Sequence, residues 1–115
     1  MNSSNPFYKE KLSPPRSYSE SLRVEPNAKS FYVFAYHHMD VVKFESKQEF
    51  DVVTVSFLSH RVRITGTHLR TFAVKLQGQT IEAVRAVPER YSRGLDTEDC
   101  VIQSIDVEEN SPRSN

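Results

Sequence analysis

The chain has 115 residues, no net formal charge and a hydrophobic content of 37%. This length is typical of one domain, and the balanced charge excludes a general attraction to nucleic acid or to acidic membranes. A single cysteine excludes an intrachain disulfide, and no apolar run approaches the ~20 residues of a membrane-spanning helix. We therefore expect a cytoplasmic protein with no membrane segment and no cofactor.

The distribution of proline and polar residues divides the chain into three parts. Residues 1–29 contain four of the six prolines and few apolar side chains, which predicts a flexible N-terminal arm. We expect a folded domain over residues 30–107 and a disordered tail over residues 108–115. A core built from so short a segment is marginally stable alone, so self-association into a homo-oligomer is the simplest remedy.

The first half of the expected domain contains strand patterns. Residues 31–37 are rich in aromatic and β-branched side chains, which favour a strand. Residues 41–45 either continue this strand past a kink or form a short strand of their own. Residues 51–65 alternate apolar and polar side chains on either side of a four-residue turn, which predicts an antiparallel β-hairpin.

A helix pattern follows the hairpin. Apolar side chains recur at i, i+3, i+4 and i+7, which predicts a helix over about 68–77 with one buried stripe; these are Leu69, Phe72, Ala73 and Leu76. Thr67 is the expected N-cap, and Gly78 is the expected left-handed residue after the helix.

The order of the expected elements in the second half of the domain predicts how the strands of the sheet are connected. Residues 80–87 have strand texture, and a strand, a helix and a strand in succession predict a right-handed crossover. That crossover would place residues 61–65 and 80–87 parallel in one sheet. Residues 100–107 are a possible edge strand. The sequence thus predicts a small α+β domain.

A short resemblance leads to a different interpretation of residues 72–87. Residues 75–79, Lys-Leu-Gln-Gly-Gln, resemble the second-strand segment of the bacterial Sm-like RNA chaperones. The resemblance implies one long bent strand over residues 72–87 in place of a helix followed by a strand. The Tyr-Lys-His run of that family is missing from this sequence.

Charge is distributed unevenly along the chain. No acidic residue occurs between Asp51 and Glu82, and basic residues gather where the strand meets the helix. Because the N-terminus of a helix favours an anion, six residues are candidates for a phosphate or carboxylate site: Arg61, Arg63, Thr65, Thr67, His68 and Arg70. The alternatives are a solvated face and a site covered by the acidic segment 95–110.

Signals for catalysis or metal binding are weak. His37 and His38 are adjacent, and adjacent side chains on a strand point to opposite faces, so we predict no metal site. Cys100 follows two acidic residues, which disfavour a reactive thiolate. The chain contains none of the glycine patterns that cradle phosphates or dinucleotides. We predict no catalytic residues.

These observations favour a non-enzymatic binding or assembly module that self-associates and makes protein–protein contacts. The alternative is anion or nucleic-acid binding through residues 61–75, which is possible but not favoured. A small enzyme of unknown class is a second alternative. Salt separates the first two, because binding to a polyanion weakens steeply as salt rises.

Overall fold

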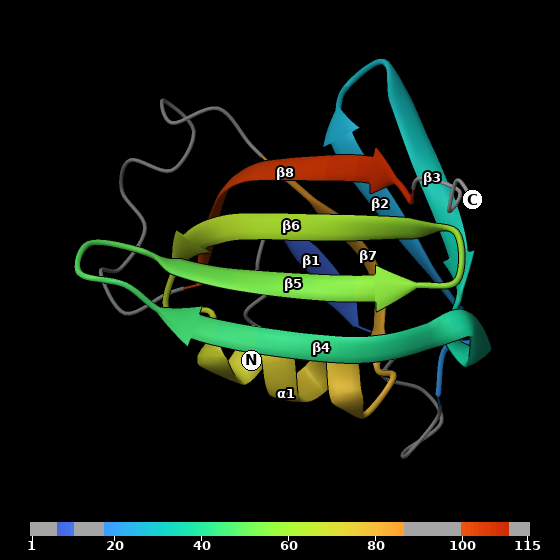
Figure 1. The fold of residues 1–115 in the computed structure, drawn as a ribbon, viewed down its shortest axis with the longest axis horizontal. Coiled ribbons are helices and arrows are strands. Elements are labelled where there is room, and N and C mark those ends of the chain that lie inside the picture. The colour runs from blue at the N-terminus through green and yellow to red at the C-terminus, as the bar shows by residue number, and fades with distance from the viewer. Residues whose placement is uncertain (1–6, 11–17, 87–99, 111–115) are drawn as a thin grey trace, which may run out of the picture.

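The computed structural model describes residues 7–10, 18–86 and 100–110. Two four-stranded sheets face each other (Figure 1). Sheet A has the order β1 (Tyr8–Glu10), β7 (Ile81–Arg85), β2 (Ser21–Asn27), β3 (Ser30–Ala35). Sheet B has the order β4 (Met39–Ser46), β5 (Asp51–Phe57), β6 (His60–Thr67), β8 (Val101–Glu109). The 3-10 helix η1 (Tyr36–His38) joins β3 to β4, and helix α1 (Arg70–Gln77) lies beside β4.

The predicted α+β fold is wrong, because strands make up 63% of the described residues and form two sheets. The predicted hairpin is present as β5 and β6, but the crossover is not. Strand β6 belongs to sheet B and β7 to sheet A, where β7 runs parallel to β2. Helix α1 therefore carries the chain from one sheet to the other. Alternation shows which face of a strand is buried, but it does not show which sheet receives the strand.

The core lies between the two sheets. Inward side chains of sheet B include Val53, Val55, Val62 and Ile64, and sheet A contributes Leu22, Val24, Ile81 and Val84. Leu69, just before α1, and Phe72 and Leu76 within it are 0% exposed, which confirms the predicted helical stripe. The Tyr36 hydroxyl donates a hydrogen bond of 2.8 Å to the carbonyl of Ile81, and burial raises the pKa of this phenol.

Two strands lie within residues 1–29, the segment expected to be a flexible arm. Strand β2 is internal to sheet A, and its Leu22 and Val24 are fully buried. Strand β1 is tied to α1 by Lys75, whose ammonium lies 3.2 Å from the Glu10 carboxylate. Desolvation lowers the pKa of Lys75, but hydrogen bonds to Tyr8 and Glu10 outweigh it and leave that pKa raised.

The C-terminal strand is longer than expected. Strand β8 ends at Glu109, so residues 108 and 109 of the expected tail belong to sheet B. The rest of the expected arm and tail, residues 1–6, 11–17 and 111–115, lies outside the described residues. In the part of the chain that is described, no helix is long and apolar enough to cross a membrane.

Both predicted helix caps are wrong. Helix α1 begins after Leu69 rather than after Thr67, and the Leu69 N–H donates to the Asp51 carboxylate at 3.0 Å. Gly78 has right-handed backbone angles (φ −82°), and the left-handed residue after the helix is Gln79 (φ 60°). The bent-strand interpretation of residues 72–87 is also wrong, because α1 and β7 are separate elements.

Candidate interaction surfaces

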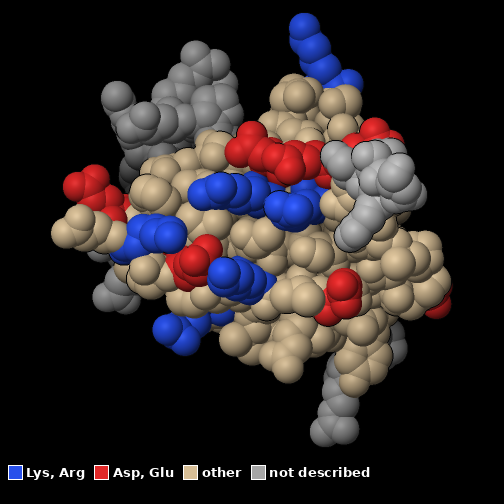
Figure 2. All heavy atoms as spheres, in the orientation of Figure 1, with Lys and Arg blue, Asp and Glu red and all other residues tan. Residues whose placement is uncertain are grey.

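The first surface is the outer face of sheet B. Arg61 and Arg63 alternate with buried Val62 and Ile64, so their exposed side chains point away from the core. Figure 2 shows basic side chains along β6 beside a row of acidic side chains along β8. The register places Arg61 opposite Glu108 and Arg63 opposite Asp106. The acidic C-terminal strand therefore lies directly beside the basic strand.

The six predicted anion-binding residues do not form one cluster. The alternation of β6 places Arg61, Arg63 and Thr65 on its outer face. Arg70 belongs to α1, and its guanidinium lies 4.8 Å from the centre of the Phe44 ring. Phe44 packs against the core, on the other side of sheet B.

The remaining predicted residues lie between these two positions. Thr67 pairs with Val101 at the end of β6. His68 is exposed and has a left-handed backbone conformation, with φ 56°. The start of α1 already has a carboxylate partner in Asp51, which occupies the place where an external anion was expected. The structure therefore brings three of the six residues together and separates Arg70 from them.

The second surface is the edge of sheet A formed by β3. Three consecutive hydrophobic residues are exposed there: Phe31 at 59%, Tyr32 at 38% and Val33 at 58%. Tyr32 stacks on Phe34, which stacks on Phe57 toward the core. Phe31 lies on the outer face, where the Arg23 guanidinium is 5.8 Å from its ring centre.

The backbone of β3 is open on one side. Among the described residues, β3 pairs only with β2. The Tyr36 N–H donates to the Glu20 carbonyl at 3.0 Å, which identifies residue 36 as a hydrogen-bonded position between the two strands. Because hydrogen-bonded pairs alternate along an antiparallel ladder, residues 32 and 34 bond to β2. The N–H and C=O groups of residues 31, 33 and 35 consequently point to the open edge.

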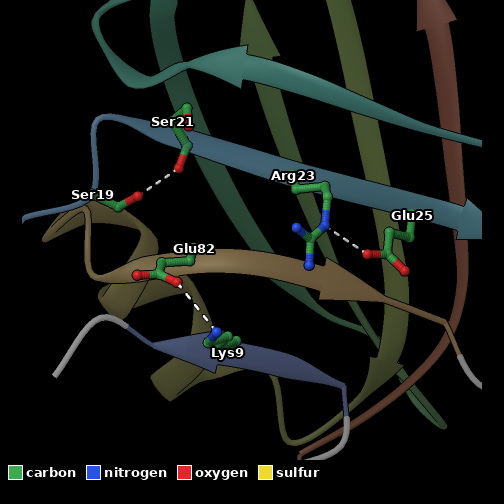
Figure 3. Close-up of polar contacts among 6 residues, drawn as sticks. All are labelled: Lys9, Ser19, Ser21, Arg23, Glu25 and Glu82. Atoms are coloured by element: carbon green, nitrogen blue, oxygen red, sulfur yellow. Dashed lines mark hydrogen bonds and ion pairs between the residues drawn. The ribbon is translucent and has the colours of Figure 1, made fainter.

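The outer face of sheet A has charges that are paired within it. Figure 3 shows Arg23 beside Glu25 on β2 and Lys9 of β1 pointing to Glu82 of β7. The Arg23 Nε donates to Glu25 at 2.7 Å, and Lys9 lies 3.8 Å from Glu82. A shallow pocket of about 230 Å³ opens there, lined in part by Lys9, Arg23 and Glu25. The paired charges give this pocket no clear ligand.

Among the described residues, the histidines and the cysteine form no recognisable metal or catalytic site. His37 and His38 lie in η1 with ring centres 4.4 Å apart. Within the described ranges, no group of three or more His, Cys, Asp or Glu side chains is placed to hold a metal ion. Cys100 is buried, and its acidic neighbours in sequence lie outside the described residues.

The sequence interpretation missed a groove between β4 and α1. It has a volume of about 420 Å³ and is lined by both elements. The only sequence signal for it is Val74, an apolar residue that lies outside the core-facing stripe of the helix and is 59% exposed.

No known protein family, curated protein or solved structure matches this chain.

Proposed function

We propose that this protein is a non-enzymatic assembly module that self-associates through the open edge of β3. The observation that carries the proposal is the composition of the sheet edges. The other edge strands carry charged residues, such as Lys9 in β1, Lys43 in β4 and Asp106 in β8. Strand β3, Ser-Phe-Tyr-Val-Phe-Ala, has no charge and no proline. Charged residues on an edge strand disfavour pairing with a second copy of the same strand, where like charges can meet, and β3 lacks this protection.

The sequence of β3 suits pairing with a second copy of itself. An antiparallel register centred on Val33 uses the backbone groups of residues 31, 33 and 35 that point to the open edge. It places Phe31 opposite the second copy's Ala35 on one face, and Tyr32 opposite the second copy's Phe34 on the other. Aromatic cross-strand pairs of this kind stabilise a sheet by about 0.2–1 kcal/mol each. The two copies would share one continuous sheet.

The alternative, anion or nucleic-acid binding through the basic residues, has less support. Arg61 and Arg63 lie beside the acidic side chains of β8, and Asp51 occupies the helix start. Both features lower the attraction that a phosphate would feel. Because β3 is uncharged, self-association through it should change little with salt. The single cysteine supports a cytoplasmic location.

Sedimentation velocity over a wide range of protein concentration tests the proposal. The wild-type chain should form a dimer whose population rises with concentration and is nearly the same at low and high salt. Val33→Lys should shift the equilibrium to monomer, because it places two like charges together at the centre of the pairing. Leu58→Lys is the matched control, because Leu58 is 71% exposed but lies in the turn between β5 and β6. A wild-type monomer at all concentrations, or a Val33→Lys dimer as stable as the control, would contradict the proposal.

A further inference from the structure

The groove between β4 and α1 combines the two features of a peptide-binding groove: an edge strand and a helix beside it. It is lined by Met39, Asp40, Val42, Phe44, Arg70, Ala73, Val74 and Gln77. Its volume of about 420 Å³ falls within the ~300–1,000 Å³ usual for ligand-binding clefts. Extended peptides bind such grooves by adding a strand to the sheet edge.

The helix presents a second stripe to this groove. Arg70, Ala73, Val74 and Gln77 follow i, i+3, i+4 and i+7 spacing, and all four line the groove. Leu69, Phe72 and Leu76 of the core-facing stripe are fully buried, and Ala73 borders both the core and the groove. Val74 contributes nothing to the core, so its exposed side chain is available to an apolar ligand.

The strand offers backbone hydrogen bonds to the same ligand. Among the described strands, β4 pairs only with β5. The Lys47 N–H donates to the Phe50 carbonyl at 2.8 Å, and alternation from that pair assigns Glu45 and Lys43 to hydrogen bonds with β5. The backbone groups of Val42 and Phe44 therefore point to the open edge, and their side chains line the groove.

The groove carries a positive side chain at one end and a negative side chain at the other. Arg70 lies beside Phe44, and Asp40 lies four residues earlier along β4, at the irregularity between Met39 and Val41. Neither side chain belongs to an ion pair among the described residues. A guanidinium stacked on a ring still presents its edge to a carboxylate. The groove is therefore complementary to a ligand with an acid at one end and a base at the other.

We infer that this groove binds an extended peptide segment of a partner protein, with an acidic and a basic side chain four positions apart and a small apolar side chain between them. The acid pairs with Arg70, the apolar side chain contacts Val42 and Val74, and the base pairs with Asp40. This site is separate from the β3 edge, so it does not depend on the proposed self-association.

Fluorescence anisotropy with three labelled peptides of the same length tests this inference. The first has the acid four positions before the base, the second has the reverse order, and the third has glutamine at both positions; all have valine midway. A peptide antiparallel to β4 reaches Arg70 before Asp40, so the first peptide should bind the full-length wild-type chain about five-fold more tightly than the other two, the gain expected from two partly exposed ion pairs of ~0.5 kcal/mol each.

A charge-swapped variant gives the decisive comparison. Arg70→Glu with Asp40→Lys should exchange the preference between the two charged peptides, because it reverses the direction of the groove. Both positions are exposed, so the variant should fold. Arg61→Glu, on the opposite face of sheet B, should leave the preference unchanged. Equal binding of the three peptides, or a preference that the swap does not exchange, would overturn the inference.

Discussion

At the scale of single residues, Gly66 allows strands β6 and β8 to approach each other closely. A Cβ at residue 66 would lie 1.9 Å from the carbonyl oxygen of Val101, which belongs to the backbone of β8. The register of β6 with β8 also shifts between Thr65 and Gly66. Only a residue without a side chain allows this approach. The predicted hairpin ended at residue 65, just before Gly66, and the strand that approaches Gly66 is distant in sequence.

Gly66→Ala should therefore destabilise the protein strongly, by about 2 kcal/mol or more, because the clash is with backbone and β8 must move. Gly78→Ala is the matched control. The nearest atom to a Cβ at residue 78 is 3.7 Å away, and the backbone there is right-handed. That substitution should be neutral or stabilise by up to about 1 kcal/mol. Urea denaturation of both variants measures the difference, and equal effects would show that β8 does not approach Gly66 as described.

At the scale of elements, local patterns predicted what each segment forms where the segment is long enough. The hairpin, the helical stripe and the strand at residues 100–107 each contain several alternating or periodic residues, and each is present in the structure. Strand β2 was missed because only Leu22 and Val24 mark its buried face, next to Pro26. The predicted crossover through α1 is wrong because it assumed one sheet. The structure has two sheets, and β7 pairs in sheet A rather than beside β6 in sheet B.

The pairing of β6 with β8 depends partly on charge and makes a second prediction. Arg61→Glu with Arg63→Glu places like charges opposite Glu108 and Asp106 and should lower the free energy of unfolding by roughly 0.5–2 kcal/mol for the two pairs. Adding Asp106→Lys and Glu108→Lys should restore most of that loss. Salt should reduce both effects, because these side chains are exposed. If the fourfold variant is no more stable than the double variant, the two strands are not coupled by charge.

At the scale of the whole molecule, the two sheets present different edges to solvent. The sequence predicted a strand over residues 31–37, which in the structure ends at Ala35 where η1 begins. It did not show that this strand would lie at an edge. It also placed the six candidate anion-binding residues together, whereas the chain turns between β6 and α1 and separates Arg70 from Arg61. The sequence interpretation assumed that residues close in sequence share one surface. This assumption fails here because the chain leaves sheet B after β6 and turns into α1.

Amide hydrogen exchange measured at low and high protein concentration tests whether a second copy of the chain pairs with the β3 edge. The N–H of Val33 points to the open edge, and those of Tyr32 and Phe34 bond to β2. Exchange at Val33 should be fast in dilute solution and should slow as concentration rises and a second copy pairs with β3, while Tyr32 and Phe34 stay protected throughout. Exchange at Val33 that is equally fast at every concentration would rule out pairing of β3 with a second copy.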